Sequence, residues 1–145
     1  MNIEDFLVLH NGKAKTMDVF EALESDSKIS QKDIEFVERD IGCKLPKKYI
    51  DFCSLFGGGY FGFTIIHSMD RQSDWYIDTV FKKFKHYLPN GYIPFSDDQA
   101  GGLYCFRVID GISLDKVFYI DANGKVLSTE YEDFLDYIAD NAYSF

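Results

Sequence analysis

The chain has 145 residues, of which 24 are acidic and 15 are basic, so its formal net charge is −9 and its pI is near 4.7. This length fits one domain, 1–145, that buries roughly two thirds of its unfolded surface. Binding to a nucleic-acid backbone needs clustered cations, so the acidic balance argues against nucleic acid and favours a basic partner, although solubility alone also explains acidity in many proteins.

Residues 1–27 are the part of the chain whose fold the sequence specifies least. The segment 6–9, before Asn11-Gly12, is compatible with either a short helix or a strand. Apolar residues from Met17 onward predict a helix that ends near Ser25. The expected domain therefore consists of an N-terminal part, 1–27, and a core over 28–140.

The segment 30–59 predicts two consecutive helices. Ser30 has the side chain of an N-cap, and Gly42 stops the first helix because glycine enters the left-handed region without a steric penalty. Pro46 is expected at the first position of the second helix, and Gly57–Gly59 end it. Apolar residues recur at helical spacing in both helices, which indicates packing against a large apolar surface. They are Ile34, Val37 and Ile41, then Tyr49, Phe52, Cys53 and Phe56.

The segments that follow alternate between strand and helix patterns. Residues 60–67 are predicted to form one strand, with Phe63 on the same face as its other odd-numbered apolar residues. The next helix is expected to begin at a cap provided by Ser73 or Asp74. Apolar residues at helical spacing continue it to about residue 87.

Strands are predicted through the last third of the chain, before a terminal helix that carries Tyr131, Phe134 and Ile138. Asn123-Gly124 is the strongest short hairpin signal, because both residues accept a positive φ. The predicted strands are 92–95 and 103–109, separated by the polar turn 96–99, then 116–121 and 125–129. This order predicts an α+β fold, a single domain whose mostly antiparallel β-sheet packs against N-terminal, middle and C-terminal helices.

Several other features place the protein among cytoplasmic proteins with reduced thiols. The first five residues lack the positive region and apolar core of a signal peptide, and no apolar run reaches membrane-spanning length. Cys43, Cys53 and Cys105 are odd in number and widely spaced, so a disulfide framework is not expected. We expect no membrane partner.

Three blocks of residues resemble those of one known family. The first is Ile34, Glu38, Ile41, Gly42, Leu45, Pro46, Tyr49, Phe52, Gly57 and Gly58. The second is Ile93, Pro94, Phe95, Gly101, Leu103, Tyr104, Cys105 and Phe106, and the third is the strand 117–121 with Phe134 and Leu135. Together they resemble the SUKH superfamily of Smi/Knr-type domains over roughly 28–140. One position departs: family members commonly have an acidic or other polar residue where this chain has Gly102.

The sequence motifs that could indicate a cofactor, a metal site or catalysis are weak. Gly57-x-Gly59-x-x-Gly62 fits a dinucleotide fingerprint literally, but a helix precedes it where the mechanism needs a strand. Asp97-Asp98 lacks a third ligand and is typical of a surface turn, and Asp121 begins a hairpin without the ligand series of a calcium loop. The cysteines are most simply core residues. We therefore expect no enzyme, no cofactor and no metal.

The resemblance implies an immunity (antitoxin) protein that binds a cognate bacterial toxin domain and occludes its active site without chemistry. We expect a nuclease, since nuclease toxins often present basic surfaces. The alternatives are an intracellular regulatory or scaffold module that binds host proteins, as the family's fungal regulator of cell-wall synthesis implies, and a small-ligand-binding protein or enzyme. Monomer and homodimer both stay open.

The residues expected to contact the toxin are acidic or aromatic. The carboxylates would mimic phosphates, and the aromatic rings would be buried at the centre of the interface. For Trp75, packing in the core is the competing interpretation. The predicted contact residues are Tyr60, Asp74, Trp75, Tyr76, Asp78, Asp97 and Asp98.

Overall fold

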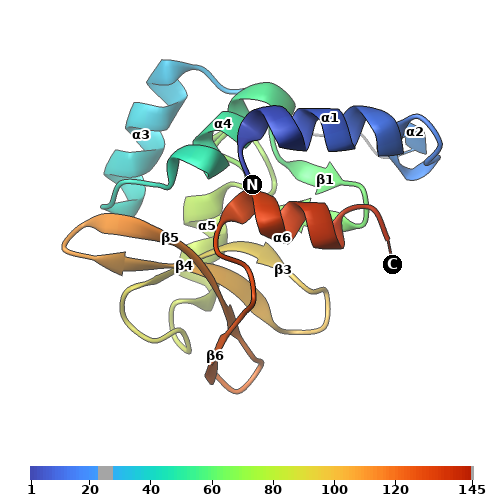
Figure 1. Ribbon diagram of the computed structural model, residues 1–145. Coiled ribbons are helices and arrows are strands. Elements are labelled where there is room, and N and C mark those ends of the chain that lie inside the picture. Colours follow the sequence, from blue (N-terminus) through green and yellow to red (C-terminus); the bar gives the residue numbers. More distant parts are fainter. Residues whose placement is uncertain (23–27, 145) are drawn as a thin grey trace.

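A computed structural model describes residues 1–22 and 28–144 (Figure 1). The helices in these ranges are α1 (Ile3–Ala14), α2 (Val19–Ala22), α3 (Gln31–Ile41), α4 (Lys47–Phe56), α5 (Ile77–Phe84) and α6 (Phe134–Asn141). The strands are β1 (Gly59–Phe61), β2 (Thr64–Ile66), β3 (Tyr92–Asp97), β4 (Leu103–Ile109), β5 (Ile112–Ile120) and β6 (Val126–Ser128).

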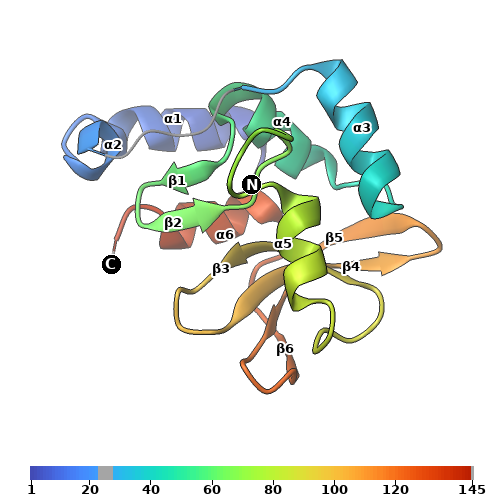
Figure 2. The same cartoon turned by 180° about the vertical axis from the view of Figure 1, so that it is seen from behind.

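The strands form one sheet in the order β1-β2-β3-β4-β5-β6, and each neighbouring pair is antiparallel. The chain is therefore a meander in which α5 is inserted between β2 and β3. Helix α6 lies on one face of the sheet (Figure 1), and α5 lies on the other (Figure 2). The predicted α+β architecture, with an antiparallel sheet packed against N-terminal, middle and C-terminal helices, is confirmed.

The two faces of the sheet bury two apolar clusters, because successive side chains of a strand point to opposite faces. Phe95 and Phe106 belong to the cluster that also contains residues of α4 and α6, and their rings stack with centroids 4.3 Å apart. Leu103 and Cys105 belong to the second cluster, on which Phe81 and Phe84 of α5 pack. Both faces of the middle strands are thus covered.

Most of the predicted helix ends are confirmed. Ser30 accepts the backbone N–H of Asp33, and Asp33 accepts the N–H of Ser30, so the two residues form a capping box. Gly42 ends α3 in the left-handed conformation with φ of 77°. Pro46 lies one position earlier than predicted, at the N-cap of α4. The segment 6–9, which the sequence left open, belongs to α1.

The prediction of one strand over 60–67 is wrong. Gly62 adopts a φ of 57° and reverses the chain, so β1 and β2 form a short hairpin. Phe63 stands at this turn and is 40% exposed, whereas Phe61 and Ile65 are buried. The alternating apolar pattern concealed the turn because glycine is compatible with both a strand and a turn.

The helix predicted from Ser73 or Asp74 is shorter than expected. The chain first folds back on itself, with the N–H of Ser68 donating to the carbonyl of Trp75, and α5 begins only at Ile77. Other strands and helices also begin or end at residues that differ from the prediction. β3 extends through Asp97, β5 begins already at residue 112, and Tyr131 lies before α6 and not within it. The helix predicted over 17–25 is present as α2, and residues 23–25 lie outside the described residues.

Asp133 and Lys48 form an ion pair that joins α6 to α4. The Asp133 side chain is buried, accepts the N–H of Asp136 as the N-cap of α6, and lies 2.6 Å from Lys48 Nζ. Burial acts to raise the pKa of Asp133, but the Lys48 ammonium, the Asp136 N–H group and the N-terminal ammonium of Met1, 3.0 Å away, outweigh it and hold the pKa below the ordinary value of 3.8. A lowered pKa means that this stabilisation is present above pH 3.8 and is lost as the pH falls through the lowered value.

Asp133→Asn is therefore expected to lower the free energy of unfolding by about 2 kcal/mol at neutral pH, between the values for exposed and for fully buried ion pairs. Asparagine is an equally good N-cap, so the loss in free energy of unfolding measures the contribution of the negative charge of Asp133. Urea unfolding at pH 7 and at pH 2 measures the effect, which should shrink at the lower pH. Asp51→Asn, in an exposed pair with Lys47 at 2.7 Å, is the matched control. An equal loss at both pH values would contradict the assignment.

Candidate partner-binding surface

Four of the seven predicted contact residues lie together. Asp74, Trp75 and Asp97 line a hollow of about 290 Å³ beside α5. Tyr60 of β1 is exposed, and its ring meets the half-buried ring of Trp75 edge-on at a centroid distance of 6.1 Å. We call these four residues the Trp75 patch. It combines two aromatic rings with two carboxylates at the surface.

Tyr76 and Asp78 are not part of the Trp75 patch, because both residues are only 6% exposed. The hydroxyl of Tyr76 donates to Asp40 of α3 at 2.7 Å, and burial, followed by this contact, raises the pKa of Tyr76. Asp78 accepts from Lys82 on the next turn of α5 at 2.8 Å. The structure places both residues where they support the start of α5 rather than where a partner can touch them.

Asp98, the last predicted residue, is held in place by its own loop. Its carboxylate accepts the N–H groups of Ala100 at 2.8 Å and Gly102 at 2.9 Å, and it also accepts the hydroxyl of Tyr119. Burial acts to raise the pKa of Asp98, but these hydrogen bonds outweigh it and the pKa is lowered. The carboxylate is therefore charged and fixed at neutral pH.

Gly102, the position at which this chain departs from the family pattern, lies against the hydrogen bond between Asp98 and Tyr119. A Cβ at residue 102 would lie 2.6 Å from the Asp98 carboxylate and closer still to the Tyr119 hydroxyl, a separation that real Cβ atoms essentially never show. The space that a side chain at 102 would take is thus filled by the Asp98–Tyr119 hydrogen bond. Polar groups are therefore present beside residue 102, but they are the side chains of Asp98 and Tyr119 and not a side chain of residue 102 itself.

Asp98 and Tyr104 together line two adjoining hollows, of about 190 and 430 Å³. The Tyr104 ring lies 5.0 Å from that of Tyr119 and 4.5 Å from that of Tyr137, and Tyr131 lies 5.7 Å from Tyr137. These side chains come from β4, β5, α6 and the segment before α6. We call Asp98, Tyr104, Tyr119, Tyr131 and Tyr137 the tyrosine hollow.

The tyrosine hollow is negatively charged. Besides Asp98, its walls include the side chains of Asp97 and Glu130, and no lysine or arginine is among the described residues that line it. The hydrogen bond to Asp98, with burial, raises the pKa of Tyr119 to about 12. Burial, followed by the charges of Asp98 and Asp140, also raises the pKa of Tyr104. Its hydroxyls therefore stay protonated, and the charge on its walls is that of the carboxylates.

Asp97 connects the two surfaces, because it lines both the hollow of the Trp75 patch and the smaller of the two hollows at Tyr104. Tyr119 has no feature in the sequence that marks it as a contact residue, and Tyr104 and Tyr131 stand out there only as a family residue and a helix residue. The signal that relates Tyr104 to Tyr119 is strand register, since the two are direct partners in the β4–β5 ladder. Register is visible only once the pairing of the strands is known.

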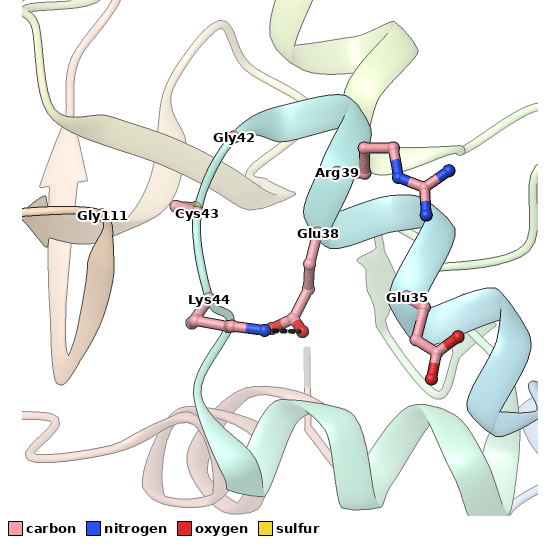
Figure 3. A pocket seen from close by; sticks show the side chains of 7 residues that line it. All are labelled: Glu35, Glu38, Arg39, Gly42, Cys43, Lys44 and Gly111. Carbon is pink, nitrogen blue, oxygen red and sulfur yellow. Dashed lines mark ion pairs between the residues drawn. The ribbon is translucent and has the colours of Figure 1, made fainter.

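Another hollow, of about 440 Å³, lies where the end of α3 meets the β4–β5 turn (Figure 3). Glu38 points toward Lys44, at 3.5 Å, and also accepts the N–H of Leu45 at 2.7 Å. Arg39 points away from the loop that carries Lys44. Glu38 therefore secures the connection between α3 and α4, and this hollow is a structural junction.

Metal-ligand clusters and exposed thiols are both absent from the described residues. No group of three histidine, cysteine or acidic side chains within 1–22 and 28–144 could hold a metal ion. All three cysteines are buried, and burial raises the pKa of both Cys43 and Cys105. The glycine run joins α4 to β1, so it does not precede a helix N-terminus. None of the described helices has the length and apolar character needed to cross a bilayer.

The family model SUKH_6, described as "SMI1-KNR4 cell-wall", matches residues 31–138. Among solved structures, a protein from Pseudomonas syringae pv. tomato superposes with a TM-score of 0.71 over 92% of this chain and 96% of its own, at 15% identity. Identity this low shows a common fold and nothing more. No curated protein sequence matches the chain.

Proposed function

The chain belongs to the SMI1-KNR4 (SUKH) family, and from this membership we propose that it is an immunity protein. It binds a cognate bacterial toxin domain and covers the toxin's active site, and it performs no chemistry itself. The observation that carries the proposal is the family match over 31–138, because this family includes toxin-immunity proteins. The same match supports the prediction that one SUKH-like domain accounts for the core of the chain.

The charge of the chain supports a basic partner such as a nuclease. The net charge is −9, and an opposed charge on the partner accelerates encounter and disfavours wrong partners. In the Trp75 patch, Tyr60 and Trp75 supply the large amphipathic rings that dominate many interfaces, and Asp74 and Asp97 supply charge beside them. Inhibition in this proposal is steric.

Co-expression tests the proposed function. The chain is produced together with the toxin-like domain encoded by a neighbouring reading frame, and cell survival is measured. Survival that depends on the chain, together with a stable complex of the two purified proteins, is the expected result. If no neighbouring frame encodes a toxic domain, or if a toxic one kills cells regardless of the chain, the immunity proposal fails.

Trp75→Ala together with Asp74→Ala is expected to weaken toxin binding by about a hundredfold, because a central aromatic residue and a nearby charge are both lost. Isothermal titration calorimetry with the purified toxin domain measures the change. Ile112→Ala is the control, since Ile112 is 58% exposed at the opposite end of the sheet. Unchanged affinity in the double variant, with its fold intact, would remove the Trp75 patch from the interface.

The alternative is a regulatory or scaffold module that binds proteins of the same cell. The description of the matched family refers to the cell wall, which favours this second possibility for some members. It predicts a stable complex with a host protein and no protection against any neighbouring toxin. The co-expression experiment therefore separates the two functions.

A further inference from the structure

Several aromatic rings of this fold have a lysine or arginine of the same chain over their face. The guanidinium of Arg107 lies 5.2 Å from the centroid of the Tyr92 ring and donates to its hydroxyl at 2.6 Å. Arg71 lies 4.9 Å from the ring of Phe36 in the same way. Both contacts use the attraction of a cation to the negative face of an aromatic ring.

The tyrosine hollow is different, because its rings have no cation of their own. Within the described residues, no lysine or arginine lies over the rings of Tyr104, Tyr119 or Tyr131. The nearby Lys116 instead donates to the Thr129 carbonyl at 2.9 Å and pairs with Glu132 at 3.1 Å. The hollow therefore combines aromatic faces with carboxylates, and among the described residues no cation lies over Tyr104, Tyr119 or Tyr131 as Arg107 lies over Tyr92 and Arg71 over Phe36.

The polar groups of the tyrosine hollow are also preorganised. Asp98 is fixed by two backbone N–H groups and one hydroxyl, and a carboxylate has about four acceptor sites, so one remains. The hydroxyls of Tyr119, Tyr131 and Tyr137 are hydrogen-bonded to Asp98, Asp140 and Ser96. The Tyr104 hydroxyl makes no hydrogen bond to any described residue, so it is available to a ligand.

We propose that the tyrosine hollow receives an arginine side chain of the protein partner, which stacks on Tyr104 and pairs with Asp98. This rests on the proposed function, in which the partner is a basic toxin domain. Arginine fits better than lysine because its guanidinium is planar, stacks on aromatic faces and is weakly hydrated, and one of its N–H groups can donate to the remaining acceptor site of Asp98. The hollow thus adds a pocket for one cationic side chain to the Trp75 patch beside it.

The first test uses small probes and needs no toxin. The ¹⁵N-labelled protein is titrated with N-acetyl-arginine amide, and with N-acetyl-citrulline amide as the uncharged analogue, while backbone NMR shifts are recorded. The arginine probe is expected to bind about threefold more tightly than the citrulline probe. Its shifts should be largest at Gly102, Tyr104 and Tyr119. Equal binding of both probes, or shifts centred elsewhere, would overturn the proposal, and a stronger response to N-acetyl-lysine amide would overturn the choice of arginine.

Variants localise the effect. Tyr104→Leu and Asp98→Asn should each abolish the preference for arginine over citrulline, whereas Tyr104→Phe should retain most of it because the ring remains. Asp121→Asn is the matched control: Asp121 accepts the N–H groups of Asn123 and Lys125, the same pattern that Asp98 makes with its loop, but outside the hollow. Chemical denaturation verifies that each variant is folded. If Tyr104→Leu still bound the arginine probe more tightly than the citrulline probe, the proposal would be refuted.

Binding to the toxin domain separates this proposal from the proposed function. If the wild-type chain neutralises the toxin and Tyr104→Leu and Asp98→Asn weaken the complex about tenfold or more, both proposals hold. If these variants bind the toxin as tightly as the wild type, the arginine pocket is refuted while the immunity function stands. If the wild type neutralises no toxin, the immunity function fails, and the probe titration still decides whether the hollow prefers arginine.

Discussion

Phe52→Ala is expected to lower the free energy of unfolding by about 4 kcal/mol, the largest effect of any single side chain considered for this fold. Phe52 of α4 is completely buried, and its ring centroid lies 4.8 Å from that of Phe61 in β1 and 5.1 Å from that of Phe134 in α6. A third partner, Phe6 of α1, lies at 6.0 Å. Truncation therefore leaves a cavity where three helices and the first strand meet, and it removes several edge-to-face ring contacts.

Urea-induced unfolding followed by circular dichroism measures the loss. Leu55→Ala is the control, because Leu55 is on the same helix but is 40% exposed, and it should cost less than about 1 kcal/mol. A loss for Phe52→Ala close to that of Leu55→Ala would mean that the aromatic cluster repacks around the vacancy. In that event Phe52 would not be the centre of the core.

The second large effect is expected at Gly62. Its φ is 57°, in a region that L side chains rarely adopt, and an added Cβ would be driven against the carbonyl oxygen of Ala142, closer than real Cβ atoms come. The next residue, Phe63, donates its N–H to the same carbonyl at 2.8 Å. The β1–β2 turn is therefore seated on the end of α6, with room for glycine alone.

Gly62→Ala is expected to reduce the free energy of unfolding by about 3 kcal/mol, the sum of backbone strain and a backbone clash that no side-chain rotation relieves. Gly111→Ala is the matched control. Gly111 has a φ of 77°, but its Cβ would meet nothing within 4 Å, so only the conformational cost of about 1 kcal/mol applies. Equal losses for the two variants in urea unfolding would show that the contact with Ala142 has no energetic weight. Because Phe63 lines one of the hollows at Tyr104, Gly62→Ala is also expected to alter that surface.

The aromatic content of the chain, 17%, serves both the core and the surface. Tyr137 shows how the two are joined: its ring packs on Phe95 in the core at 5.3 Å and on Tyr104 at 4.5 Å, and its side chain is almost entirely buried. The base of the tyrosine hollow is thus part of the hydrophobic core. A surface supported in this way keeps its shape when it is exposed, which lowers the cost of ordering it on binding.

The sequence by itself determined the family, the α+β class and most helix ends, because these depend on local chemistry. Ser30 and Gly42 act through the backbone of their own helix, and Asn123-Gly124 acts within its own turn, so each could be recognised without knowing any neighbour. The same local reasoning misplaced the β1–β2 turn and the start of α5. In both places a contact outside the local pattern decides: Ala142, far along the chain, receives the turn at Gly62, and Ser68 pairs with Trp75 and Ile77 across the loop before α5.

Only the tertiary structure decided which acidic and aromatic residues share a surface. Tyr76 and Trp75 are neighbours in sequence, yet Tyr76 is buried against Asp40 while Trp75 meets Tyr60 at the surface. Tyr104 and Tyr119 are fifteen positions apart, yet they are direct partners in the sheet. Which side chains meet depends on strand register and on where the chain turns, and a shift of one residue in register moves every side chain to the opposite face. The family could therefore be recognised from the sequence alone, whereas the surface proposed to bind the partner could not.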